Sequence, residues 1–312
     1  MKNANNRVVG VVFALFVTFV TFSILEPVFY QLDNLLEIGV QAAIITFVAL
    51  GVTFVIVTGG IDISVGSMVG LISVICATNL PHWGIVKTII AAIIIGSLLG
   101  FFNGAISAFF SLQSFVVTLA TLNLFRGIAF VYTQGRPIYN LDTKFRDVFS
   151  ANFGAIPRPI LLITVMTIAS FLLLNRTKIG VHIKAVGTNL DAARKSGIQV
   201  KKAQISAFVI CGAFSGLASL MLMSRIGAAE PISGTGFELQ AIAAVVVGGT
   251  SLMGGRGSIV GTVLGSLLLA SIAVGLTLLN INAFVQLVVT GLIVLVAVLI
   301  DRFATTSKSG RS

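Results

Sequence analysis

The sequence predicts an all-α fold, a polytopic bundle of about ten membrane-spanning helices, and three features of its composition carry this prediction. Of the 312 residues, 56% are hydrophobic and 32 are glycine. Only 10% are charged, whereas about 25% is usual in a soluble domain. The mean hydropathy is +1.06. A water-soluble globule cannot hide this much apolar surface, so these values exclude a soluble enzyme.

Ten apolar segments come close to the length of about 20 residues that a bilayer span requires. In chain order they are 8–25, 38–57, 64–80, 86–110, 115–133, 159–175, 203–224, 239–249, 257–279 and 283–300. The first is longer than a signal-peptide core and no small-residue cleavage site follows it, so we predict a retained span. Residues 64–80 and 239–249 are short and flanked by glycine, which makes them candidates for broken or re-entrant helices.

The distribution of Lys and Arg predicts the orientation of the chain. With the N-terminus inside, ten spans place 13 of the 20 basic residues inside and six outside, and leave Arg126 within a span. Acidic residues divide the other way, three inside and seven outside. We therefore expect both termini in the cytoplasm. The net charge of +10 then reports orientation and gives no reason to expect nucleic-acid binding.

Two loops are longer than simple turns. Residues 134–159, on the outside, mix charged side chains with Phe145, Val148 and Phe149, which predicts a short surface helix. Residues 176–202, on the inside, form the most basic segment of the chain. Glycines at a spacing of four residues predict close helix packing at Gly96, Gly100 and Gly104 and again at Gly257, Gly261 and Gly265.

Several kinds of chemistry lack the residues that they need. No Gly-Lys-Ser/Thr run forms a phosphate-binding loop, and both histidines, His82 and His182, fall in predicted loops. No metal site is expected, and Cys76 and Cys211 sit in apolar runs as buried small residues. Carboxylates within spans are scarce, which argues against an ion-coupled carrier. The classes of membrane protein that remain are a channel and a pore subunit that another protein drives.

The basic inner loop contains a predicted helix over Gly187–Gly197. Thr188 and Asp191 have capping-box spacing, Arg194 and Lys195 suit the negative helix end, and Gly197 is placed to end the helix. A helix of about eight residues is marginal alone in water. It must therefore pack against this chain's own cytoplasmic face or enter the groove of a partner.

Four runs of residues resemble the ribose-permease family of bacterial ABC-type sugar permeases. Thr177–Ile198 is similar to the cytoplasmic coupling loop of that family. Thr58–Gly70, Leu124–Ile138 and Ser233–Gly265 resemble the corresponding family segments in the expected order. The resemblance implies one transmembrane permease domain over 1–312, in the bacterial inner membrane, with a coupling loop at 176–202. It assigns the coupling role to Gly187, Thr188, Asn189, Asp191, Ala192, Ala193, Arg194, Ser196 and Gly197.

The same resemblance implies the partners. They are a cytoplasmic subunit that hydrolyses ATP, a periplasmic sugar-binding protein, and a second permease copy, identical or paralogous, within the membrane lipid. This chain would then be no enzyme and would need no cofactor of its own. Ribose is the first expected substrate, although other pentoses, hexoses and autoinducer-2 pass through similar pores. A self-sufficient facilitator or channel for small polar solutes is the alternative.

Candidate path or gate residues lie at the breaks between apolar runs. Gly59-Gly60 free the backbone beside Asp62 and Ser64, where Asp62 serves as a helix cap or as part of the pathway. Gly248-Gly249 repeat this pattern and suggest an internal duplication.

Further candidates lie in or near the spans. Phe237 and Glu238 would close the pore, contact the sugar or the binding protein, or simply anchor a loop at the interface. The remaining polar candidates are Asn103 and Asn123, which hydrogen-bond between helices or line the path. Arg126 either extends toward the outer interface or pairs with a buried carboxylate.

Overall fold

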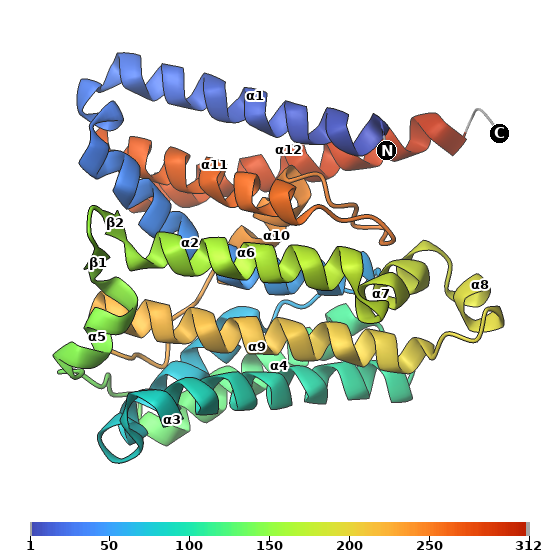
Figure 1. Ribbon diagram of the computed structural model, residues 1–312, viewed down its shortest axis with the longest axis horizontal. Helices are drawn as coiled ribbons and strands as arrows, with labels where there is room; N and C mark the ends of the chain where they lie inside the picture. The colour runs from blue at the N-terminus through green and yellow to red at the C-terminus, as the bar shows by residue number, and fades with distance from the viewer. Residues whose placement is uncertain (1, 310–312) are drawn as a thin grey trace.

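The structure is a computed structural model that describes residues 2–309, and within that range its regular secondary structure is all helical apart from one two-stranded hairpin. The elements in order are α1 (Lys2–Leu25), η1 (Pro27–Tyr30), α2 (Leu32–Val57), α3 (Val65–Phe109), α4 (Ser114–Thr133), α5 (Thr143–Ser150), β1 (Asn152–Phe153), β2 (Ile156–Pro157), α6 (Arg158–Arg176), α7 (Lys178–Thr188), α8 (Leu190–Lys195), α9 (Val200–Ile226), α10 (Phe237–Val247), α11 (Ile259–Leu278) and α12 (Ala283–Ser309). The long helices run side by side along the long axis of the molecule (Figure 1). The predicted all-α membrane bundle is confirmed.

Seven helices are long and apolar enough to cross a membrane within the described residues. One of them, α3, is two spans joined at a sharp turn. Gly84, three residues after Pro81, has the non-helical angles φ 67° and ψ 175°. Asn103 Nδ2 donates to Ser64 Oγ over 2.8 Å, although a straight helix would separate residues 39 positions apart by about 58 Å. The two arms of α3 therefore correspond to the predicted spans 64–80 and 86–110.

The predicted short segment 239–249 is also present, as the 11-residue helix α10. Its start is deep in the protein, because Gly66 in the first turn of α3 lies against the Gly234 carbonyl group and the Glu238 carboxylate. It runs antiparallel to α11, with Gly248 against Gly261 and Ala244 against Gly265. These contacts describe a short helix that begins and ends inside the bundle rather than at its two surfaces.

Glycine permits close packing between α3 and α9. A Cβ atom built on Gly212 would overlap the Gly96 carbonyl oxygen, and one on Gly100 would overlap the Phe208 carbonyl oxygen. The close approach predicted from the Gly96-Gly100-Gly104 spacing is confirmed, and its partner is α9. Of the second predicted set, Gly261 and Gly265 of α11 serve the same purpose against α10, whereas Gly257 precedes α11 and lies against the Val57 side chain of α2.

Helix α2 lies at the centre of the fold, with most of its apolar window buried. Its side chains form the main core with residues of α9, α10 and the first turns of α3. By contrast, α1 and α4 expose many of their apolar side chains. Apolar surface of this kind is suited to contact with lipid or with another membrane protein.

The two ends of the bundle differ in construction. Helix α5 and the β1–β2 hairpin lie at one end, whereas α7, α8, the start of α1 and the end of α12 lie at the other (Figure 1). The surface helix predicted within 134–159 is α5, which begins where Asp142 Oδ1 accepts the Lys144 N–H over 2.9 Å. The loop predicted at 176–202 contains two helices, α7 and α8.

Candidate functional site

The predicted coupling loop is divided between two helices, which corrects the single helix expected over Gly187–Gly197. Gly187 and Thr188 form the end of α7, and the Thr188 hydroxyl donates to the Lys184 carbonyl oxygen over 2.8 Å. The N-cap of α8 is Asn189 instead, whose Oδ1 accepts the Ala192 N–H over 2.9 Å. Thr188 cannot be the N-cap of α8, because an N-cap residue has a non-helical backbone and Thr188 is still part of α7. Gly197 follows α8 with φ 81°, as predicted for a terminating glycine.

Helix α8 presents one face to the protein and the other to solvent. Ala193 is buried in a small cluster with Val186, Val200 and Ala203. Asp191 and Arg194 project outward, with 81% and 68% of their side chains exposed, and form a loose ion pair of 3.9 Å. The helix therefore packs on this chain's own surface and still leaves charged side chains free to meet a partner.

Behind α8, the end of α7 contacts two segments that are far apart in sequence, the end of α2 and the loop before α11. A Cβ atom on Gly187 would overlap the Val57 carbonyl oxygen at the end of α2. That oxygen accepts the Gly255 N–H over 2.8 Å, and Gly255 (φ 73°) lies against Thr188. We call Val57, Gly187 and Gly255 the glycine joint. It connects the α7–α8 segment directly to α2 and to the loop before α11.

A buried polar cluster follows the end of α2. Asp62 Oδ1 accepts both the N–H and the hydroxyl group of Ser64, over 2.9 Å and 2.7 Å. Ser64 in turn accepts from Asn103, and Thr118 Oγ1 accepts the Ile63 N–H over 3.2 Å. Asp62 Oδ2 and Asn103 Oδ1 have no hydrogen-bond partner among the described residues. Asp62 thus braces the turn before α3, while Ser64 is the N-cap residue and makes no side-chain cap bond.

Arg126 does not extend to the outer interface, because its guanidinium group is hydrogen-bonded to the loop before α10. Its Nη1 donates to the Pro231 and Ser233 carbonyl oxygens, over 2.6 Å and 2.7 Å. Beyond this loop, the Glu238 Oε1 atom at the start of α10 accepts the Gly236 N–H over 3.1 Å. The sequence predicted either extension toward the outer interface or pairing with a buried carboxylate for Arg126. Neither prediction names its principal partners, which are two backbone carbonyl groups.

The remaining path candidates are not part of one site. Phe237 packs against the main core. Asn123 is exposed on α4, where its Nδ2 donates to the Leu119 carbonyl oxygen of the same helix over 3.3 Å.

The backbone hydrogen bonds that follow Gly248 at the end of α10 repeat the pattern that follows Thr58 at the end of α2. Gly59 and Gly249 each donate to the carbonyl oxygen three residues back, with φ 84° and 88°. The suggested duplication stays a prediction.

Comparison with known proteins gives the family. A family model described as the permease component of the branched-chain amino acid transport system matches residues 34–298. Ribose import permease protein RbsC of Haemophilus influenzae is 40% identical over 304 residues, covering 95% of this chain and 93% of its own. RbsC of Bacillus subtilis is 42% identical, covering 94% and 92%. D-allose transport system permease protein AlsC of Escherichia coli is 34% identical, covering 94% and 91%. No solved structure gives a significant match.

This chain belongs to the ribose-permease family. The resemblance that four sequence runs suggested is therefore confirmed over nearly the whole length of the permease. Gly187 and Gly255 of the glycine joint fall within segments that carried the resemblance, as do Asp62 and Ser64 of the polar cluster. Val57, Asn103 and Thr118 lie outside those segments.

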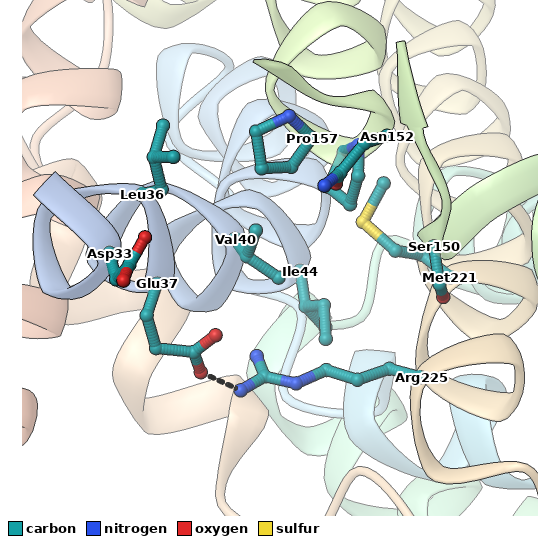
Figure 2. Close-up of a pocket in the computed structure, with 11 residues that line it drawn as sticks. Asp33, Leu36, Glu37, Val40, Ile44, Ser150, Asn152, Pro157, Met221 and Arg225 are labelled. Carbon is teal, nitrogen blue, oxygen red and sulfur yellow. Dashed lines mark hydrogen bonds and ion pairs between the residues drawn. The ribbon is translucent and has the colours of Figure 1, made fainter. Parts of the chain in front are cut away.

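The permease also has a polar pocket that sequence reasoning missed, at the end opposite α8. Figure 2 shows Glu37 of α2 in an ion pair with Arg225 of α9, with Asp33 beside it and Asn152 of the hairpin across the opening. The pocket volume is about 350 Å³. Its charges come from the ends of two elements, α2 and α9, so only isolated polar residues beside apolar runs mark it in the sequence.

Proposed function

We propose that this permease is the membrane-spanning subunit of an ATP-driven importer for a monosaccharide, with a ribose-type sugar as substrate. The observation that carries the proposal is the match to ribose import permeases, at 40% and 42% identity over more than nine-tenths of the chain. The D-allose permease is less similar, at 34%. Ribose itself therefore fits better than allose or xylose.

In this proposal a separate cytoplasmic subunit hydrolyses ATP, and α8 docks on it. The exposed Asp191 and Arg194 support this role, because solvent-facing charges on a short helix braced from behind offer a rigid contact. The docking segment is the 176–202 loop. The permease itself has no enzymatic activity and carries no cofactor, so ATP chemistry belongs to the partner.

The end of the bundle that carries α7 and α8 is the cytoplasmic end in this proposal. It contains Arg176, Lys178, Arg194, Lys201 and Lys202, and the positive-inside rule places such loops in the cytoplasm of the inner membrane. Both termini are then cytoplasmic, since α1 begins and α12 ends at this end of the bundle (Figure 1). In the same loop, partial burial lowers the pKa of Lys184 below its usual range.

A second permease copy, identical or paralogous, completes the pore. Asn123 supports this, because an amide on the exposed apolar face of α4 is costly against lipid and favourable against another polar surface. At the opposite end, the pocket with Asp33, Glu37 and Arg225 gives a periplasmic sugar-binding protein a polar surface to dock on. We assign Asp62, Ser64, Asn103, Phe237 and Glu238, with Gly248 and Gly249, to the path or its gates.

The proposal is tested by assembling the transporter from its parts. Tagged permease is co-expressed with a candidate ATPase subunit and a candidate sugar-binding protein from the same organism, and the subunits that co-purify are counted. We expect the ATPase to co-purify with wild-type permease and to be lost from Asp191→Lys, while Lys144→Gln at the opposite end changes nothing. Calorimetry of the sugar-binding protein with ribose, allose and xylose then identifies the sugar. Preference for a non-sugar ligand would overturn the substrate assignment.

A further inference from the structure

A groove of about 660 Å³ runs beside α8, where the spans α3, α4 and α9 reach the end of the bundle. Its lining comes from the end of α3, the following loop, α8 and the first turns of α9. We call it the basic groove, and the side chains that define it are Ser107, Phe109, Leu112, Arg194, Lys201 and Lys202.

The charges of the basic groove are all of one sign. Arg194, Lys201 and Lys202 line it, and no acidic side chain lines it within the described part of the chain. Asp191 is nearby on α8, but it faces solvent and meets Arg194 only at 3.9 Å. Three cations without a matching set of carboxylates form a site that attracts an anion.

The apolar part of the groove lies at the same level. Phe109 and Leu112 are 60% and 50% exposed, directly where the α3 span ends. The Lys201 Nζ atom stands 5.1 Å from the centre of the Phe109 ring, so a positive charge and an apolar surface are held side by side. An amphipathic ligand at a membrane interface matches this pairing, whereas a free inorganic anion would leave the apolar side chains in water.

One polar side chain that lines the groove has an unsatisfied hydroxyl group. Ser107 Oγ is buried and has no hydrogen-bond partner among the residues that the structure describes. A buried hydroxyl group without a partner is costly, and it is relieved when a ligand oxygen accepts its hydrogen bond. This hydroxyl group lies in the lining of a groove whose other polar members are cations.

We propose that the basic groove binds one anionic phospholipid, with the headgroup phosphate between Lys201, Lys202 and Arg194 and within reach of the Ser107 hydroxyl group. The acyl chains then continue into the bilayer past Phe109 and Leu112. Because the headgroup lies against α8, the lipid holds α8 in place on the bundle. This proposal needs neither the sugar nor the ATPase, so it stands or fails independently of the transport function.

Native mass spectrometry of the purified full-length permease tests the proposal with phosphatidylglycerol and phosphatidylcholine of identical acyl chains. We expect wild-type permease to retain phosphatidylglycerol preferentially. Replacing both lysines, Lys201→Gln with Lys202→Gln, should weaken that binding on the order of tenfold. The matched control is Arg176→Gln with Lys178→Gln, which removes the same charge from exposed residues at the same end and should leave the affinity within about twofold.

A third variant separates a built site from general surface charge. Ser107→Ala removes no charge and should still weaken phosphatidylglycerol binding, roughly threefold, because it removes one hydrogen bond. Equal losses in the two double variants, or no preference for phosphatidylglycerol, would overturn the proposal. It would also be overturned if Lys201→Gln with Lys202→Gln kept the lipid and lost the ATPase, since the groove would then be a protein contact.

Discussion

Gly187 at the end of α7 lies directly against the Val57 carbonyl oxygen at the end of α2, with no room for a Cβ atom between them. The same oxygen accepts the Gly255 N–H, so one carbonyl group joins three segments. Displacement of α8 and α7 is thereby passed to the central helix α2 and to the loop before α11 without any flexible side chain between them. This contact gives the proposed docking helix a mechanical route into the membrane.

The first prediction concerns the glycine joint. Gly187→Ala should reduce ATP-driven sugar uptake at least tenfold, because the new methyl group forces α7 away from Val57 and breaks the Gly255 hydrogen bond. Membrane insertion and ATPase docking should persist, since α8 keeps its sequence. Uptake in vesicles and ATPase co-purification measure both. Gly10→Ala is the control, because nothing lies within 4 Å of a Cβ there; equal effects in the two variants would contradict the prediction.

The second prediction concerns the end of α8. Gly197 has φ 81°, which proline cannot adopt because its ring fixes φ near −65°. Gly197→Pro should abolish uptake while leaving the amount of inserted protein unchanged, as should Asp191→Lys by reversing a charge on the docking face. Western blots of membrane fractions and sugar uptake test this directly. Normal uptake in either variant would remove α8 from the coupling role.

The third prediction concerns the packing of α3 on α9. Gly212→Val should destabilise the permease by about 1–3 kcal/mol, because its side chain collides with the Gly96 carbonyl group. Thermal unfolding in detergent measures the loss as a lower Tm. Gly127→Ala on α4, where a Cβ meets nothing within 4 Å, should leave the Tm unchanged or raise it slightly. A Gly212→Val protein as stable as wild type would mean that the helices are not in this close contact.

The fourth prediction concerns the buried turn before α3. Asp62→Ala leaves the Ser64 N–H and hydroxyl group without their acceptor and should cost about 1–3 kcal/mol of stability. Asp62→Asn keeps the accepting oxygen and should be close to wild type in Tm. Thermal unfolding of the two variants side by side decides the matter. If Asp62→Asn is as unstable as Asp62→Ala, the carboxylate has a role other than bracing Ser64.

The fifth prediction concerns Arg126 and the loop that it holds. Arg126→Gln should free residues 231–236, because two charge-assisted hydrogen bonds to backbone carbonyl groups are lost. A cysteine introduced as Ser233→Cys should then react with a maleimide several times faster than it does beside Arg126. The native cysteines, Cys76 and Cys211, are buried and contribute little background. An unchanged labelling rate would show that other contacts fix the loop.

Much of this architecture is predictable from sequence because lipid imposes a simple rule. Each span must be apolar over a fixed length, and breaks must contain residues that tolerate unusual backbone, as at Gly84. The short helix α10 and the surface helix α5 follow from the same reasoning. The glycine spacing at Gly96 and Gly100 predicts close packing, but it does not name α9 as the partner.

What could not be predicted depends on contacts between distant residues. Thr188 and Asn189 are both good capping residues, and the choice between them is decided by α7, which stays helical through Thr188 while Gly187 lies on Val57. Arg126 finds its partners more than 100 residues later, in carbonyl groups that no side-chain pattern marks. The pocket with Glu37 and Arg225 joins elements that only the folded chain brings together.

The central claim is that this permease moves a sugar only when an ATPase drives it. The most direct measurement is uptake of labelled ribose into proteoliposomes that contain the permease, the sugar-binding protein and ATP, with and without the ATPase subunit. We predict accumulation against a gradient when the ATPase is present and none when it is omitted. Equilibration of ribose by the permease alone would contradict the claim and identify a self-sufficient facilitator.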